Sequence, residues 1–132
     1  MESHPKKILI ADDDPAILEV LALFLEDIGY EVETTHDGHM LLALKPDSAD
    51  LLLLDIWMSG WDGRDICRFL KSQEQTRHLP IVLFSANRET ERIAQEAGAD
   101  DFLVKPFDLE ELLKKVEQYL PTGTEGFPNT YP

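Results

Sequence analysis

Five side chains that suit phosphoryl chemistry stand directly after short apolar runs of the sequence. Asp12 and Asp13 follow the run ILIA, and Asp55 follows four consecutive leucines. Ser85 follows IVLF, and Lys105 follows FLV. Crowded carboxylates repel one another unless a cation compensates, and Mg²⁺ prefers oxygen ligands and commonly shares a phosphate. Because a lysine ammonium and a serine hydroxyl bind phosphoryl oxygens, this set predicts a Mg²⁺-dependent phosphoryl site with Asp55 as candidate nucleophile.

Each of these residues also has a purely structural interpretation. The acidic run 12–14 resembles the charge cluster that a helix N-terminus favours, and we interpret Asp14, which precedes Pro15, as a helix cap. A single aspartate after a strand is usually a turn residue, and a Lys-Pro pair alone indicates little. A helix cap does not explain why Asp55, Ser85 and Lys105 each follow an apolar run. The recurrence of a polar residue at this place favours a functional site.

The elements that would position these residues follow from the hydrophobic pattern. We predict strands over 8–11, 30–35, 51–54, 81–84 and 102–104, of which the second is more polar and nearer an edge. We predict helices over 15–28, 38–44, from 62 or 63 through 70, 89–97 and 109–120. This alternation predicts an α/β fold: a five-stranded parallel sheet with helices on both faces. Ligands of such sheets bind beyond the carboxyl ends of the strands, where the five polar residues would converge.

Composition narrows the class of protein. The 132 residues suffice for one domain, which we place at 1–120, and we interpret 121–132, with three prolines and two glycines, as a tail or truncated linker. A net charge of −14 argues against direct binding of nucleic acid. The one cysteine excludes an intrachain disulfide, and no apolar run reaches the length of a signal peptide or membrane span. We therefore expect a cytoplasmic protein without membrane contact.

Four segments together resemble the receiver domain of two-component response regulators: ILIADDDP, LLLLDIWMSGWDG, PIVLFSA and GADDFLVKPF. With their spacing they cover residues 6 to about 120, nearly the whole chain. The resemblance implies the strand order 2-1-3-4-5 in a flavodoxin-like, three-layer α/β/α fold, similar to chemotaxis receivers.

The resemblance also implies roles around the acidic cluster. Asp55 is the implied phosphoacceptor, and its donor is a histidine kinase or a histidine phosphotransfer protein. Asp13 and Asp55 are implied Mg²⁺ ligands, and Asp12 acts mainly through a bound water. The backbone carbonyl of Trp57 is implied as a further ligand, while its bulky indole either covers the phosphoryl site or packs on the loop.

One further residue is implied to hold the phosphoryl group, and two are implied to transmit the signal. Lys105, in a cis peptide with Pro106, bonds the phosphoryl group, and Ser85 is the switch hydroxyl that moves toward it. Phe102 is the aromatic switch residue, which would turn into the space that Ser85 leaves.

These roles describe a phosphoacceptor switch that catalyses its own phosphoryl transfer and autodephosphorylation and is otherwise not an enzyme. We expect it to act through a downstream protein partner or effector domain, as a monomer or weak homodimer. One alternative is a pseudo-receiver that serves as an interaction module without phosphorylation. An aspartyl-phosphate-type phosphatase generally needs a second aspartate two residues after the first, where Trp57 stands. A flavodoxin-type cofactor binder would meet repulsion between its phosphate and residues 12–14.

Overall fold

The computed structural model describes residues 5–58 and 60–121. Its strands are β1 (Lys7–Ala11), β2 (Glu31–Thr35), β3 (Leu51–Asp55), β4 (Trp57–Met58), β5 (Trp61–Asp62), β6 (Ile81–Ser85) and β7 (Asp101–Val104). Its helices are α1 (Pro15–Ile28), α2 (Gly38–Leu41), α3 (Gly63–Ser72), α4 (Thr90–Ala97) and α5 (Leu109–Tyr119).

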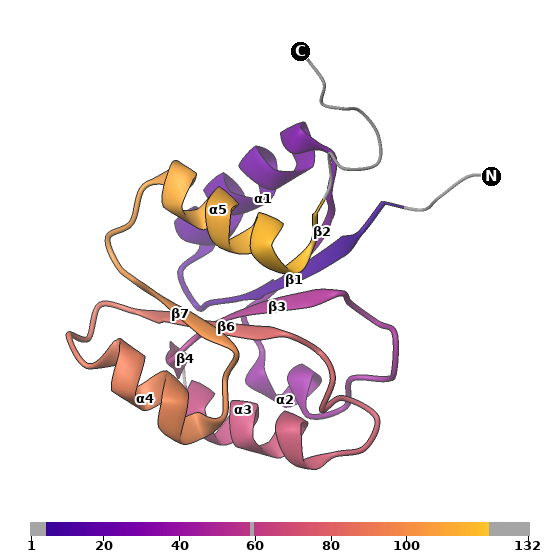
Figure 1. Ribbon diagram of the computed structural model, residues 1–132, viewed down its shortest axis with the longest axis vertical. Coiled ribbons are helices and arrows are strands. Elements are labelled where there is room, and N and C mark those ends of the chain that lie inside the picture. Colours follow the sequence, from indigo (N-terminus) through magenta and orange to yellow (C-terminus); the bar gives the residue numbers. More distant parts are fainter. Residues whose placement is uncertain (1–4, 59, 122–132) are drawn as a thin grey trace.

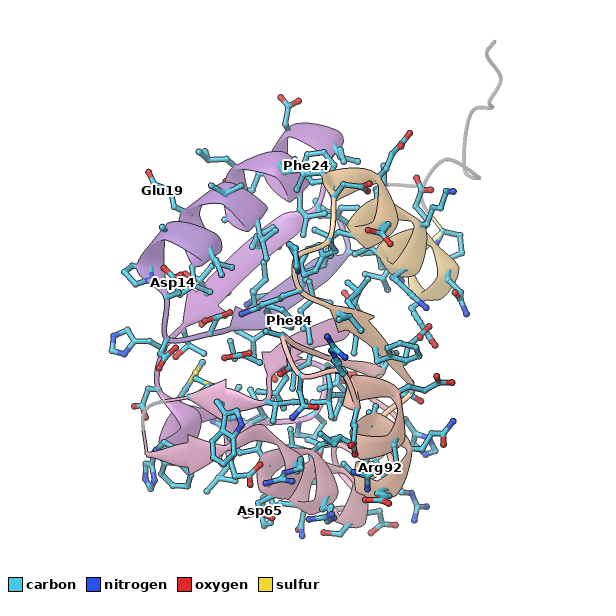
Figure 2. The ribbon with its side chains drawn as sticks, turned by 90° about the vertical axis from the view of Figure 1, so that its left-hand side faces the viewer. Asp14, Glu19, Phe24, Asp65, Phe84 and Arg92 are labelled. Atoms are coloured by element: carbon cyan, nitrogen blue, oxygen red, sulfur yellow. The ribbon has the colours of Figure 1, made fainter. Side chains whose placement is uncertain are left out.

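The five longer strands form one parallel sheet in the order β2-β1-β3-β6-β7. Because β4 and β5 form a separate two-stranded sheet, this is the predicted order 2-1-3-4-5, and the predicted fold class is confirmed. Helices α1 and α5 cover one face of the sheet, and α2, α3 and α4 cover the other (Figure 1). Figure 2 shows these layers from the side, with Glu19 of α1 and Arg92 of α4 on opposite sides of Phe84 in β6.

The leucine run of β3 shows why the sheet needs two cores. Successive side chains of a strand point to opposite faces. Leu51 and Leu53 pack in the core on the α1–α5 side, whereas Leu52 and Leu54 pack on the side of α3 and α4. All four are at most 1% exposed, as expected for a central strand that is covered on both faces. The more polar β2 lies at the edge of the sheet, as its sequence predicts.

Aspartates set the starts of most helices. The predicted cap of α1 is confirmed, since the Asp14 carboxylate accepts the Ala16 N–H at 3.0 Å and Pro15 is the first helical residue. Asp62 caps α3, and Asp108 forms a capping box with Glu111 at the start of α5. These caps satisfy backbone N–H groups that the helices leave without an internal partner.

The prediction of a helix over 38–44 is wrong in its last turn. Helix α2 ends at Leu41, and the N–H groups of residues 42–44 donate to carbonyl oxygens three residues earlier, at 3.1–3.3 Å. Pro46 provides the physical reason, because it has no N–H and disfavours helical geometry in the residue before it.

The segment after β3, which the sequence pattern presents as a loop, contains the antiparallel pair β4–β5. Trp57 pairs with Asp62, and Met58 pairs with Trp61. Gly60 allows the turn, since its φ of 75° lies in the left-handed region that favours glycine. This pair links Asp55 to the start of α3, so it lies beside the site described below.

The end of α5 is joined to the segment that precedes β2. Leu120 is buried, and its carbonyl oxygen accepts the Tyr30 hydroxyl at 3.0 Å. The predicted boundary at 120 remains a prediction, and residues 122–132 of the predicted tail lie outside the described residues. Among the residues that the structure describes, no helix combines the length and apolar character needed to cross a bilayer.

Candidate functional site

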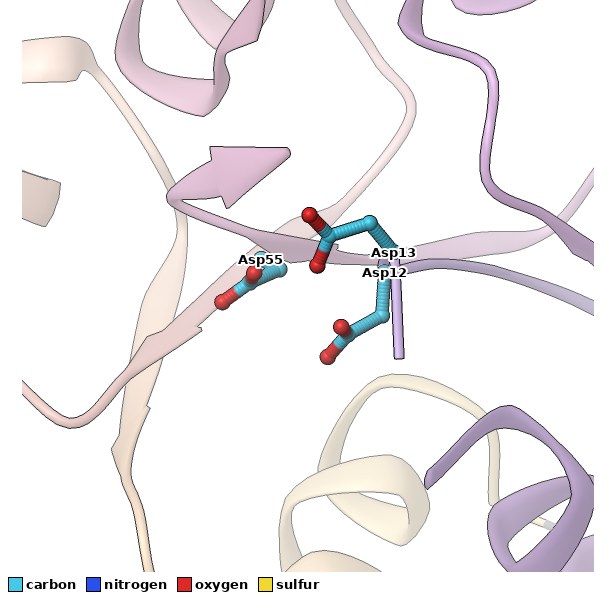
Figure 3. A group of neighbouring side chains, drawn as sticks. All are labelled: Asp12, Asp13 and Asp55. Atoms are coloured by element: carbon cyan, nitrogen blue, oxygen red, sulfur yellow. The ribbon is translucent and has the colours of Figure 1, made fainter. Parts of the chain in front are cut away.

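Strands β1 and β3 bring the three predicted carboxylates together. The two strands are parallel neighbours, and their register pairs Ala11 with Leu54, so the next residues, Asp12 and Asp55, end at the same edge. One carboxylate oxygen from each of Asp12, Asp13 and Asp55 lies within 4.8 Å of the others. Figure 3 shows the three side chains facing the space beyond the strand ends. Asp12 and Asp55 are 1% and 7% exposed, and Asp13 is exposed.

Lys105 reaches this cluster from the segment that follows β7. Its backbone N–H donates to the Ser85 carbonyl oxygen at 2.8 Å, which fixes the segment against the end of β6. Its Nζ donates to Asp12 Oδ2 at 2.9 Å and to Asp55 Oδ1 at 3.4 Å, and it lies 4.9 Å from the centre of the Phe84 ring. The Lys105–Pro106 peptide is cis, as the resemblance implies. The Lys105 ammonium therefore donates hydrogen bonds to two buried carboxylates.

Burial and mutual repulsion govern the electrostatics of the cluster. Burial, followed by the negative charge of Asp12, raises the pKa of Asp55 to about 6, although Lys105 works in the opposite direction. Burial by itself lowers the pKa of Lys105. The hydrogen bond with Asp12 and the charge of Asp55 raise this pKa by more than burial lowers it, so the net shift is upward. Asp55 is therefore mostly ionised at neutral pH, at an energetic cost that a bound cation would relieve.

The donor set fits Mg²⁺. Three carboxylates offer hard oxygen ligands, and the exposed position of Asp13 leaves an open side on which a small cation keeps several of its waters. The two oxygens of Asp12 are already engaged: Oδ1 accepts the Asp14 N–H at 2.9 Å, and Oδ2 accepts Lys105 Nζ. Asp12 is thus suited to act through a water bound to the cation.

Ser85 closes the site at the end of β6. It is 6% exposed, and its Oγ accepts the Asn87 N–H at 3.1 Å. This hydrogen bond uses an oxygen lone pair and not the hydroxyl proton, so it leaves the donor capacity of Ser85 unchanged.

The aromatic side chains singled out by the sequence pack against other residues: Phe102 against the core and Lys115, and Trp57 against Arg64. Phe102 is half-buried on β7 and packs against the α3–α4 core, with Lys115 Nζ 5.2 Å from its ring centre. Trp57 is 59% exposed, and its indole lies under the guanidinium of Arg64, which is 5.5 Å from the ring centre. The structure thus favours the packed position of the indole over the covering one.

The sequence analysis considered position 63 only as a possible helix start and not as part of the site. In the structure, Gly63 packs against the backbone of Asp55 and Ile56. A Cβ at this position would overlap the backbone carbonyl oxygen of Asp55 and lie 2.9 Å from Ile56 Cα, so α3 can begin this close to the site only with glycine. The Asp-Gly pair after the apolar run is the signal that would have identified it.

Comparison with known proteins gives a consistent result. The family described as "Response regulator receiver domain" matches residues 8–117. The chain is 38% identical over 120 residues to the "DNA-binding dual master transcriptional regulator RpaA" of Synechocystis, covering 86% of this chain and 48% of that protein. It is 44% identical over 117 residues to the response regulator MprA of Mycobacterium avium, covering 86% and 50%. The chain therefore spans about half the length of these relatives.

Among solved structures, the fold is similar to the receiver domain of the sensor histidine kinase PA1611 from Pseudomonas aeruginosa, which has a magnesium ion coordinated in its active site cleft. The TM-score is 0.78 at 26% sequence identity, and the match covers 90% of this chain and all of that one (100%).

Proposed function

Since this chain belongs to the response regulator receiver family, we propose that it is a phosphoacceptor switch in a two-component phosphorelay, with Asp55 as the residue that accepts the phosphoryl group. The observation that carries this proposal is the position of Asp55. Its buried carboxylate lies 3.4 Å from Lys105 Nζ and within 4.8 Å of the carboxylates of Asp12 and Asp13.

The donor in this proposal is a phosphohistidine of a kinase or phosphotransfer protein. An oxygen of ionised Asp55 bonds to phosphorus while the phosphorus–nitrogen bond breaks, and the released imidazole takes up a proton. Lys105 then holds one phosphoryl oxygen, and the Ser85 hydroxyl donates to another. Positioning and electrostatic stabilisation account for most of the catalysis in phosphoryl transfer, so the chain needs no further acid or base.

Asp13, Asp55 and the backbone carbonyl of Trp57 would hold Mg²⁺, and Asp12 would act through one of the ion's waters. The engaged oxygens of Asp12 support this division. When bound, the ion neutralises the negative charge that accumulates on the phosphoryl oxygens.

Ser85 and Phe102 are proposed to carry the signal away from Asp55. The strand register places Phe102 opposite Leu83, two residues before Ser85 on β6, so a shift of Ser85 toward the phosphoryl group would change the packing next to Phe102. The phosphoryl group must bind one of the two packings better than the other for this to act as a switch.

The surface beside the site supports docking of a protein donor. A groove of about 800 Å³ runs between α1 and the start of α5, and Lys105 and Ala86 lie at its site end. Its other lining residues are mostly apolar: Ala16, Ile17, Val20, Leu21, Pro106, Phe107, Asp108 and Leu109. Contiguous exposed apolar surface of this kind marks interaction sites.

The output of the switch is proposed to pass to a downstream protein partner or effector domain, which is consistent with the longer, DNA-binding relative. We do not propose direct contact of this domain with nucleic acid or membrane.

The test uses acetyl phosphate and Mg²⁺ as phosphodonor and cofactor, with intact-mass measurement of the unmodified chain, Asp55→Asn and the exposed control Asp27→Asn. We expect one phosphoryl group on the unmodified chain and the control, and none on Asp55→Asn. Undiminished labelling of Asp55→Asn would overturn the assignment. Absence of labelling in every variant would favour the pseudo-receiver, and steady release of phosphate from excess p-nitrophenyl phosphate would favour the phosphatase.

A further inference from the structure

Trp57 stands two residues after Asp55, so its side chain begins near the proposed phosphoacceptor. One residue separates the two, and this residue, Ile56, is buried in the core at 1% exposure. Two residues span at most about 7 Å, so the large indole originates next to the carboxylate. Any rotamer that directs the ring over Asp55 would obstruct a phosphodonor or an attacking water.

The structure instead holds this indole over the start of α3. Arg64 binds Asp62 through two nitrogens, with Nη2 donating to Oδ2 at 2.7 Å and Nε to Oδ1 at 3.0 Å. This pairing lowers the pKa of the Asp62 carboxyl, chiefly through the hydrogen bonds from Arg64. The Asp62 carboxylate also accepts the Arg64 N–H at 2.9 Å as the cap of α3, so both ends of Arg64 are fixed.

The β4–β5 pair aligns these groups with the indole. Trp57 and Asp62 are directly opposite in the ladder, and opposite residues project from the same face of a sheet. The fixed guanidinium therefore lies above the Trp57 ring, 5.5 Å from its centre, at a distance typical of cation–π contact. Trp61, which pairs with Met58, packs toward the core instead.

We propose that Arg64, oriented by Asp62, is a positioning residue that holds the Trp57 indole away from Asp55 and so keeps the phosphoryl site open. The inference rests on the proposed function of Asp55. In hydrolysis, a water oxygen bonds to phosphorus as the bond from phosphorus to the Asp55 oxygen breaks. The carboxylate is regenerated, and both water protons leave on the phosphate as H₂PO₄⁻. An indole over the site slows this attack and slows phosphorylation equally.

The expected effect follows from the strength of such contacts. Losing an exposed cation–π contact shifts the balance between held and free positions of the ring by about two- to fivefold. Arg64→Gln is therefore expected to slow both acetyl phosphate labelling and phosphate release by a factor of up to about five. In a Trp57→Ala background, the same substitution should have no effect, because there is no ring left to hold.

Arg68→Gln is the matched control. It removes the same charge one turn further along α3, where Arg68 makes an exposed ion pair with Asp65 at 3.2 Å. Its rates should equal those of the unmodified chain. Arg64→Lys should give an intermediate effect, because lysine keeps the charge but lacks the planar fork that binds Asp62 through two nitrogens. Thermal melting confirms that all variants are folded before rates are compared.

A second readout separates this inference from the proposed function. In a Trp61→Phe background, Trp57 fluorescence and its quenching by acrylamide report the position of the ring without any phosphorylation. We expect Arg64→Gln to change both, and Arg68→Gln to change neither. An unchanged ring signal, or an equal slowing in the Trp57→Ala background, overturns the inference. A shifted ring signal with no labelling of the unmodified chain overturns the proposed function, and with it the effect of Arg64 on rates.

Discussion

Replacing the buried acid Asp55 by asparagine is expected to stabilise the folded protein at neutral pH. Asp55 is 7% exposed, and burial together with the charge of Asp12 raises the pKa of its carboxyl from 3.8 to about 6. Asparagine keeps the shape of the side chain but carries no charge. The substitution therefore removes the cost of holding an ionised carboxylate in this environment.

The sign and size of the effect follow from proton linkage. A raised pKa means that the folded state binds the proton more tightly than the unfolded state, so stability is lost as pH rises from 3.8 to about 6 and stays low above it. At 1.36 kcal/mol for each pKa unit, the cost is about 1 kcal/mol at pH 4.5 and about 3 kcal/mol at pH 7.5. Asp55→Asn should raise the free energy of unfolding by about these amounts.

Urea denaturation of the unmodified chain and Asp55→Asn at both pH values measures this difference directly. The exposed control Asp27→Asn should change stability by less than about 0.5 kcal/mol at either pH. Mg²⁺ at ten times its Kd should add about 1.4 kcal/mol to the unmodified chain and less to Asp55→Asn. If the two proteins differed by the same amount at pH 4.5 and pH 7.5, the electrostatic account of the site would be refuted.

Three further substitutions test the parts of the site separately. Lys105→Met is expected to lower the free energy of unfolding by about 1–3 kcal/mol in urea, because the buried Asp12 carboxylate loses its 2.9 Å partner; unchanged stability would contradict this pairing. Asp13→Asn is expected to raise the Kd for Mg²⁺ by at least about tenfold in a tryptophan fluorescence titration, and an unchanged Kd would show that Asp13 is not a ligand. Gly63→Ala is expected to cost about 1–3 kcal/mol, seen as a lower melting temperature, because its Cβ overlaps the Asp55 backbone.

The architecture was predictable because its signals are local. A run such as Leu51–Leu54 is continuously apolar when a strand is covered on both faces, and Asp14 followed by Pro15 specifies the first turn of α1 within two residues. The errors arose where local signals are weak. The two-residue strands β4 and β5 are too short to show a hydrophobic period. The helix predicted over 38–44 ends at Leu41, ahead of Pro46.

What the sequence by itself determined is which polar residues stand at the ends of the strands. Parallel strands end at one edge of a sheet, so the residues after each apolar run had to converge there. Only the tertiary structure decided which of these side chains bind one another. Lys105 binds Asp12 across 93 positions and Asp55 across 50, and Arg64 fixes an indole that the pattern alone left in either of two positions. These pairings and the raised pKa of Asp55 depend on burial and on distances between separate segments, and no local pattern of residues encodes either.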